Sequence, residues 1–330
     1  MSSAVSFEST CDAPTEDFDE LLQGLESKFI PPKYFYDRRG SELFETICTL
    51  PEYYPTRTEI AILREHAHDI AKLISPGSVV VELGSGASEK VRLLLDAIEP
   101  SAYLGIDISR EFLRSATTRL AQDYPWLDVH AACADLSQPL HLTYPPLELP
   151  RLVFYPGSSL GNFKPHEAEQ FLRQLRPFVG RRQPLAGGLL IGIDLQKDPR
   201  ILHAAYNDAQ GVTAAFNRNL LYRLQRDYGA QVDPEAFAHE AVYNSKEGRI
   251  EMYLVSQRDQ AIELASHRFE FPQGTRLCTE YSYKYTIDGF ADLARRAGYL
   301  VEAVWTDAQR LFSVHYLRNS QGQARNSTSK

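Results

Sequence analysis

The stretch VVVELGSGASEK, residues 79–90, joins an apolar run to a loop with two glycines. Three successive valines are typical of a parallel strand that is buried on both faces. Gly84 and Gly86 would let the loop backbone approach a ligand closely, or would simply form a tight turn. The third glycine of the dinucleotide-binding pattern is missing, because Lys90 and Val91 stand where it could fall. If the loop binds a nucleotide-bearing molecule, an ordinary dinucleotide is therefore not expected.

Apolar runs alternate with helical segments on both sides of this stretch, from residue 57 to residue 195. The runs are SVVVEL, AYLGID, DVHAACADL, RLVFYPG and GLLIGIDL, and HEAEQFLRQLRPFV has apolar residues at helical spacing. This alternation predicts an α/β fold with a doubly wound, Rossmann-like parallel sheet. YLVEAVWTD and LFSVHYLR, near the C-terminus, lie close enough in sequence to add two antiparallel strands to that sheet.

The alternation stops between residues 196 and 284, where a helix-rich segment precedes the strand-like runs RIEMYLVSQ and LCTEYSYKY. Together with the aromatic N-terminal region, this part predicts a second, α+β domain inserted into the first. The expected boundaries are 57–195 plus 285–318 for the Rossmann-like domain, 16–56 plus 196–284 for the inserted domain, and 1–15 and 319–330 for disordered tails.

The composition argues against several classes of function. The net charge of −8, without a basic block, does not suit a nucleic-acid backbone. No apolar run approaches the roughly 20 residues that span a bilayer, and the acidic N-terminus does not resemble a signal peptide. The four cysteines are scattered without metal-ligand spacing, so neither a disulfide framework nor a metal site is expected. We expect a cytoplasmic protein that acts on a small molecule, without nucleic-acid or membrane partners.

Acidic residues end the two strands that follow the glycine loop. Asp107 follows Gly84 at about the distance expected of a carboxylate that binds ribose hydroxyls, and Asp135 is placed to meet an adenine amino group. Acidic and small residues without a phosphate cradle suit S-adenosylmethionine, which carries a sulfonium cation and an amino acid instead of phosphates. The predicted cofactor-binding residues are Gly84, Ser85, Gly86, Lys90, Asp107, Asp135 and Leu136.

The methyl acceptor is not expected to be a nucleic acid. Amino-methyltransferases of DNA and RNA need an (Asp/Asn)-Pro-Pro-aromatic motif after the fourth strand, where this chain has YPGSSLGNF. Six longer stretches, PPKYFYDRRGSELFETICTLPEYYPTRTE, VELGSGASEK, GSSLGNF, AAYNDAQGVTAAFNRN, RIEMY and TEYSYKY, resemble the stand-alone L-histidine Nα-methyltransferases of ergothioneine biosynthesis. The resemblance covers residues 30–317. It identifies the fold as a class I methyltransferase sheet and implies an enzyme that methylates the histidine α-amine three times, giving hercynine.

The resemblance also implies where the amino acid is held, between the two domains. Tyr53, Asn162 and Tyr206 would bind its amino and carboxylate groups, and Tyr53 and Asn162 would be the catalytic residues. The amine proton would leave to Tyr53 or to water before each transfer. The alternative for Tyr53 and Tyr206 is aromatic core packing, and the alternative for Asn162 is a turn. We expect a monomer, with a separate sulfoxide-forming enzyme for the next step.

Glu280 and Ser282 stand two apart in an extended stretch, so their side chains are predicted to project from one face. A carboxylate and a hydroxyl side by side suit an imidazole, which offers an N–H donor and a ring nitrogen. Cys278 and Lys284 are expected on the same face. The alternative is an exposed strand face of mixed polarity.

Two further residues complete the predicted substrate site. By the resemblance, Met252 would pack on the imidazole ring and Tyr36 would reach the same ring, although a methionine at strand period is ordinarily core. Two rival functions remain: methylation of another amino acid or small amine, and a catalytically idle protein that binds S-adenosylmethionine. Intact Tyr53, Asn162 and Glu280 argue against the idle protein.

Overall fold

The computed structural model describes residues 5–9, 17–140, 142, 144, 149–179 and 187–320. The chain forms two compact units. Unit 1 comprises Met1–Cys11, Pro55–Gln196 and Lys284–Lys330, and unit 2 comprises Asp12–Tyr54 and Lys197–Tyr283. The chain therefore passes from one unit to the other after residues 11, 54, 196 and 283. The sequence predicted the last three of these boundaries after residues 56, 195 and 284, within two residues of those in the structure.

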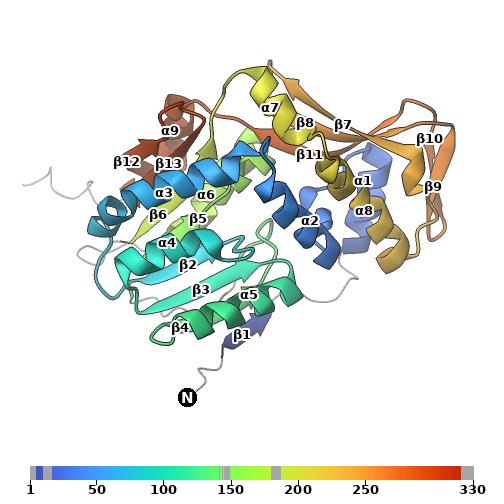
Figure 1. Cartoon of the computed structure of the whole chain (residues 1–330). Helices are drawn as coiled ribbons and strands as arrows, with labels where there is room; N and C mark the ends of the chain where they lie inside the picture. The colour runs from blue at the N-terminus through green and yellow to red at the C-terminus, as the bar shows by residue number, and fades with distance from the viewer. Residues whose placement is uncertain are drawn as a thin grey trace, which may run out of the picture. The chain divides into compact units, whose positions relative to one another are not determined.

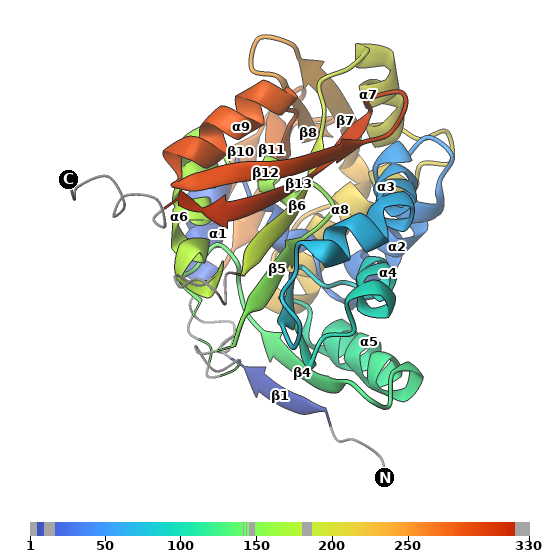
Figure 2. The same ribbon diagram turned by 90° about the vertical axis from the view of Figure 1, so that its left-hand side faces the viewer.

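Unit 1 contains a sheet with the strand order β1-β4-β3-β2-β5-β6-β13-β12 (Figure 2). The first six strands in this order are parallel, β13 is antiparallel to β6, and β12 is antiparallel to β13. This confirms the doubly wound sheet and its two antiparallel C-terminal strands. The strands are β1 (Ser6–Ser9), β2 (Val79–Leu83), β3 (Ala102–Asp107), β4 (Asp128–Cys133), β5 (Arg151–Tyr155), β6 (Gly188–Asp194), β12 (Tyr299–Thr306) and β13 (Phe312–Asn319).

Helices cover both faces of this sheet, as the buried valines of β2 require. Figure 2 shows α3, α4 and α5 on one side, and α6 and α9 on the other. The first group contributes Ile62, Leu94 and Leu120 to one hydrophobic core that also includes Val80 of β2. The helices are α3 (Tyr54–Lys72), α4 (Glu89–Ile98), α5 (Arg110–Asp123), α6 (Pro165–Val179) and α9 (Ile287–Arg296).

The prediction of a disordered N-terminal tail over residues 1–15 is wrong for residues 6–9. These residues form β1, which pairs in parallel with the outer edge of β4 from Ser6–His130 to Ser9–Cys133. Phe7 packs against the cluster of Leu113, Ala131 and Cys133, and the Arg114 guanidinium lies 4.8 Å from the Phe7 ring centroid. The strand is therefore held by edge hydrogen bonds and one aromatic anchor. Residues 1–4 and 10–15 lie outside the described residues.

The expected C-terminal tail, residues 319–330, begins too early. Asn319 is the last residue of β13, and its side-chain amide donates to the Arg176 carbonyl at 3.1 Å. Ser320 donates its backbone N–H to the Gly298 carbonyl at 3.0 Å. The rest of this predicted tail, residues 321–330, lies outside the described residues.

Unit 2 combines helices with a small antiparallel sheet of order β11-β8-β7, which agrees with the expected α+β character (Figure 1). A separate hairpin pairs β9 with β10. The helices are α1 (Asp17–Ser27), α2 (Arg38–Thr49), α7 (Pro199–Tyr206) and α8 (Val212–Tyr228). The strands are β7 (Phe237–Asn244), β8 (Arg249–Ser256), β9 (Gln260–Leu264), β10 (His267–Phe271) and β11 (Arg276–Tyr283).

Candidate active site

The glycine loop after β2 has a left-handed backbone at alternate residues. The φ angles are +67° at Gly84, +50° at Gly86 and +56° at Ser88. The N–H groups of Gly84 and Ser85 both donate to the Ile106 carbonyl at the end of β3, at 2.8 and 3.0 Å. A Cβ atom added at Gly84 or Gly86 would meet no atom within 4 Å. The glycines are therefore required by the backbone conformation, and the space beside them suits a ligand.

Asp107, at the end of β3, organises this loop. Its carboxylate accepts hydrogen bonds from the N–H groups of Gly86 and Ser109, both at 2.9 Å. Desolvation raises the pKa of Asp107, and these backbone hydrogen bonds oppose the increase. Asp135 instead closes a turn after β4, because its Oδ1 accepts from the N–H and the hydroxyl of Ser137 at 2.8 and 2.7 Å. Both predicted carboxylates thus lie at the carboxyl ends of neighbouring parallel strands.

Sequence reasoning missed Glu82, a carboxyl group beneath the glycine loop. Glu82 is 1% exposed, and the Tyr103 hydroxyl donates to it at 2.7 Å. Burial raises the pKa of Glu82 to about 8, although the hydrogen bond from Tyr103 opposes this. The group therefore holds a proton at neutral pH. The signal was available, since Glu82 interrupts an apolar run whose residues were expected to be buried on both faces.

Asn162 ends the turn that follows β5. Gly157 and Ser158 have φ angles of +76° and +58°, and a single 3₁₀ turn then runs from Ser159 to Asn162. β5 pairs in parallel with β2, so this turn and the glycine loop leave the same edge of the sheet. That edge, at the point where the strand order reverses, is where doubly wound sheets bind their ligands. Lys90 lies in the first turn of α4 and forms an ion pair with Glu59 at 2.7 Å.

Aromatic rings from five segments gather in unit 2. The ring centroids of Tyr53 and Tyr206 are 6.4 Å apart, and those of Tyr53 and Phe44 are 6.2 Å apart. Phe216 of α8 lies 5.8 Å from Tyr36 and 6.0 Å from Phe44. We call Tyr36, Phe44, Tyr53, Tyr206 and Phe216 the aromatic cluster. Sequence reasoning gave no role to Phe44 or Phe216, although both lie in stretches that carry the family resemblance.

Two polar side chains of β11 adjoin the aromatic cluster. The hydroxyls of Ser282 and Tyr206 are 2.8 Å apart and hydrogen bonded. Glu280 is 8% exposed and stands opposite Met252 of β8, which is 1% exposed. Burial raises the pKa of Tyr53 well above its usual range, and the negative charge of Glu280 contributes to the increase. The predicted substrate residues other than Asn162 are therefore neighbours within unit 2.

A β-bulge corrects one expectation about this strand. Cys278 stands opposite Tyr253, whereas Glu280 stands opposite Met252, so Thr279 is an extra residue in β11. Tyr253 and Met252 are successive residues of β8 and point to opposite faces. Cys278 therefore does not share the face of Glu280, because the bulge cancels the alternation. Lys284 lies beyond the end of β11, in unit 1, where it forms a buried ion pair with Asp194 at 2.8 Å.

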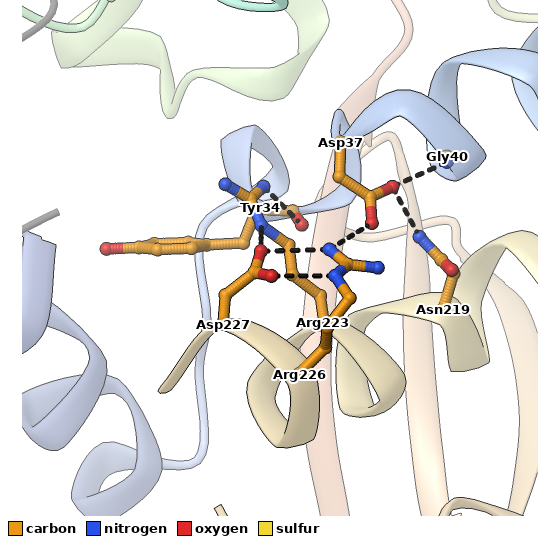
Figure 3. Close-up of polar contacts among 7 residues, drawn as sticks. All are labelled: Tyr34, Asp37, Gly40, Asn219, Arg223, Arg226 and Asp227. Carbon is orange, nitrogen blue, oxygen red and sulfur yellow. Dashed lines mark hydrogen bonds and ion pairs between the residues drawn. The ribbon is translucent and has the colours of Figure 1, made fainter. Parts of the chain in front are cut away.

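The segment that carries Tyr36 is tied to α8 by charged hydrogen bonds (Figure 3). Asp37 caps α2 by accepting from the Gly40 N–H at 2.6 Å. The same carboxylate accepts from Asn219 at 2.8 Å and from Arg226 at 2.7 Å. Residues that are 182 and 189 positions away in sequence thus fix the backbone beside Tyr36.

Two kinds of site are absent from the part of the chain that the structure describes. No group of three or more His, Cys, Asp or Glu side chains in it could hold a metal ion. None of its helices is long and apolar enough to cross a membrane.

Comparisons with known proteins show to which family the chain is similar. Residues 17–319 match the family described as "Histidine-specific methyltransferase, SAM-dependent". The histidine N-alpha-methyltransferase of Mycolicibacterium smegmatis is 41% identical over 286 residues, covering 85% of this chain and 87% of that protein. Ergothioneine biosynthesis protein 1 of Neurospora crassa is 30% identical over 303 residues, covering 88% of this chain and 33% of that protein.

A relative named for a different amino-acid derivative is also similar. The 4-dimethylallyltryptophan N-methyltransferase of Trichophyton verrucosum is 30% identical over 285 residues, covering 82% of this chain and 83% of that protein. The family match extends through both units and includes the glycine loop, the Asn162 turn and the aromatic cluster. On these grounds, the chain belongs to the family of histidine-specific methyltransferases that depend on S-adenosylmethionine.

Proposed function

We propose that this protein transfers three methyl groups from S-adenosylmethionine to the α-amine of L-histidine, giving hercynine in the first step of ergothioneine biosynthesis. The single observation that carries the proposal is that the buried Glu280 carboxylate lies two residues from Ser282, whose hydroxyl is hydrogen bonded to that of Tyr206 in the aromatic cluster. These groups match the two ends of histidine, a charged amino-acid head and an imidazole. In this proposal unit 1 binds the cofactor, and the amino acid is bound by residues of unit 2 and by Asn162 of unit 1.

The residues of unit 1 suit S-adenosylmethionine, which supplies the methyl group from its sulfonium centre. The open space beside Gly84 and Gly86 can accept its amino-acid part, with Lys90 near the carboxylate. Asp107 can accept hydrogen bonds from the ribose hydroxyls, while Asp135 and Leu136 contact the adenine. A negatively charged loop edge without a phosphate cradle favours a cationic ligand over a dinucleotide.

Tyr53, Asn162 and Tyr206 bind the amino and carboxylate groups of histidine in this proposal. The amine must lose its proton before each transfer, because only the lone pair can attack the methyl group. The raised pKa of Tyr53 keeps the phenol protonated at neutral pH. Its oxygen can therefore accept a hydrogen bond from the amine and orient it, while the released proton passes to water. Most of the rate enhancement then comes from positioning.

The aromatic cluster suits the later rounds of methylation. The amine becomes a quaternary ammonium ion, which can no longer donate hydrogen bonds once it carries three methyl groups. Aromatic faces attract such a cation through the ring quadrupole. Tyr53 and Phe44 supply two such rings within 6.2 Å of each other. The ring faces can thus stabilise the methylated amine as its N–H groups are replaced by methyl groups.

The imidazole is recognised by Glu280, Ser282, Met252 and Tyr36. The Glu280 carboxylate can accept the ring N–H, and the Ser282 hydroxyl can donate to the other nitrogen. Met252 stands opposite Glu280 in the register and can pack on the ring face.

A second candidate function is methylation of another aromatic amino acid, which the similarity to the dimethylallyltryptophan enzyme favours. Mass spectrometry of products from a panel of amino acids, incubated with the purified protein and S-adenosylmethionine, distinguishes the candidates. Histidine should gain up to three methyl groups, and tryptophan and phenylalanine should react at least about tenfold more slowly. No methylation of any amino acid would leave only cofactor binding.

We further propose that the protein is a cytoplasmic monomer whose product is consumed by a separate sulfoxide-forming enzyme. The described cysteines, Cys48, Cys133 and Cys278, form no disulfide bond, which suits a reducing compartment. Light scattering after size-exclusion chromatography measures the oligomeric state, and a mass near twice 37.3 kDa would contradict the monomer.

A further inference from the structure

A buried carboxylate in unit 1 joins the two loops of the proposed reaction site. The Glu59 side chain, on α3, is 0% exposed, and its Oε2 lies 2.7 Å from Lys90 Nζ. The same oxygen accepts the Gly157 N–H at 2.9 Å. Lys90 follows the glycine loop, and Gly157 begins the turn that ends at Asn162. One carboxylate therefore contacts segments that lie 31 and 98 residues away in sequence.

The neighbouring strand leaves room for this carboxylate. A Cβ atom added at Gly192 of β6 would lie 2.0 Å from Glu59 Oε1, so any larger residue there would displace the carboxylate. A Cβ atom added at Gly157 would lie 3.5 Å from Lys90 Nζ. Gly192 thus leaves room for the Glu59 carboxylate where α3 packs on the sheet, whereas Gly157 is required by its φ angle of +76° and not by a lack of space.

Fold stability alone does not account for a buried ion pair at this place. Burying charges is costly, and well-packed apolar residues often replace such pairs without loss of stability. The neighbours Ile62 and Leu63 on α3 are apolar and buried. An apolar residue at position 59 would continue the same core. The ion pair therefore points to a requirement for geometry at the loops that it joins.

The turn after β5 is held at two successive left-handed residues. Gly157 is held by Glu59, and the Ser158 hydroxyl accepts the Asp194 N–H at 2.9 Å. A left-handed backbone at a residue other than glycine is strained and persists only where its surroundings hold it. Release of Gly157 would remove a contact that ties this turn to α3, and Asn162 ends the turn.

We propose that Glu59 is a positioning residue for methyl transfer, whose carboxylate fixes Lys90 of the cofactor loop and the Gly157–Asn162 turn relative to each other. The proposal rests on the functions proposed above for Lys90 and Asn162. Glu59 touches neither substrate nor cofactor in this account. Methyl transfer requires the loop that binds the cofactor and the turn that carries Asn162 to be aligned. Displacements of about 1 Å can cost on the order of 100-fold in rate.

Two substitutions separate the contacts of Glu59. Glu59→Gln keeps an oxygen that can accept the Gly157 N–H but removes the charge that pairs with Lys90. Glu59→Leu removes both contacts. We expect Glu59→Gln to weaken binding of S-adenosylhomocysteine about 2- to 30-fold in calorimetry, with kcat nearly unchanged. Glu59→Leu should in addition lower kcat for histidine at saturating substrates. Glu65→Gln, at an exposed position of the same helix, is the matched control and should change neither value.

Double-variant cycles provide the decisive test. If Glu59 acts through Lys90, then Glu59→Gln should weaken S-adenosylhomocysteine binding much less when Lys90 is already Met. If it acts through Asn162, then Glu59→Leu should lower kcat much less when Asn162 is already Ala. The proposal would be overturned if the losses in affinity and in kcat were additive in both cycles. It would also be overturned if folded Glu59→Leu bound S-adenosylhomocysteine and turned over histidine as the parent does. The single variants at Lys90 and Asn162 test the proposed function separately. If Glu59→Leu does not fold, the cycle that combines Glu59→Gln with the Lys90 variant still tests whether Glu59 acts through Lys90.

Discussion

The hydroxyl of Tyr206, at the end of α7, is hydrogen bonded to the hydroxyl of Ser282 on β11 at 2.8 Å. The resemblance assigned Tyr206 to the amino-acid head of the substrate, and the position of Ser282 beside Glu280 suggested a contact with its imidazole. A direct bond between them means that the groups proposed to bind the two ends of histidine share one hydrogen-bond network. Such a network orients both hydroxyls before the substrate arrives, so less entropy is lost on binding.

Asp107→Ala should weaken cofactor binding by roughly 1.5–3 kcal/mol, because the ribose hydroxyls lose a charged acceptor. The variant also frees the Gly86 N–H, which Asp107 accepts at 2.9 Å, so the loop itself should become less ordered. Calorimetry with S-adenosylmethionine measures the affinity. An unchanged affinity in a folded variant would contradict the assignment of Asp107 to the cofactor.

Asn162→Ala should reduce histidine turnover and leave cofactor affinity nearly intact. The side chain ends the turn after β5, while the backbone of that turn is held by Glu59 and by the Ser158–Asp194 contact. Loss of the amide should therefore leave the turn in place. Steady-state kinetics measures the turnover of histidine, and calorimetry on the same preparation measures the affinity for the cofactor. Normal turnover would make Asn162 a turn residue only.

The pH dependence of stability should reveal the proton on Glu82. Burial raises its pKa in the folded protein to about 8, above the ordinary value of 4.5. The stabilisation from this group is complete below pH 4.5 and is lost as the pH rises through about 8, because the unfolded state releases the proton first. A shift of one pKa unit corresponds to about 1.4 kcal/mol.

Glu82→Gln removes this titration while keeping an oxygen that can accept the Tyr103 hydroxyl. Between pH 5 and pH 8.5, the melting temperature of the parent should therefore fall more steeply than that of the variant. Thermal unfolding across this range measures the difference. Parallel pH profiles would show that Glu82 does not titrate anomalously.

Several parts of the fold follow from local sequence signals. The valines of β2, and the alternation of strands and helices around them, predicted the parallel sheet because both features depend on neighbours in sequence. β1 escaped prediction since its four residues, SFES, have no distinctive pattern and gain order only by pairing with β4. The bulge at Thr279 was also invisible, because the alternation of side chains along β11 is unbroken in the sequence.

The candidate site, like the fold, could be predicted only where the signal lies in neighbouring residues. The positions of Gly84, Gly86 and Asp107 at strand ends could be predicted from their spacing, whereas most substrate residues were assigned by family resemblance, and their roles stay predictions. Glu59 could not be found from the sequence, since its partners Lys90 and Gly157 come together only when α3 packs on the sheet. Side chains that link distant loops carry no local signal.

Glu280 provides the sharpest test, because it decides between histidine and other amino acids. If its carboxylate accepts the imidazole N–H, then Glu280→Ala should cost roughly 1.5–3 kcal/mol of histidine affinity, or about 10- to 150-fold. The groups proposed for the amino-acid head remain in the variant. The loss should therefore fall on the choice of side chain rather than on methyl transfer.

The measurement is the ratio of kcat/KM for histidine to that for phenylalanine or tryptophan, in the parent and in Glu280→Ala. The ratio should fall, because a site without the carboxylate no longer leaves a buried charge unpaired when an apolar ring enters. Glu240→Ala is the matched control, since Glu240 lies on the same sheet but pairs with Arg276 at 2.8 Å. A ratio that moves equally in both variants, or in neither, would reduce Glu280 to part of a polar strand face. The substrate would then be an amino acid whose side chain this strand does not select.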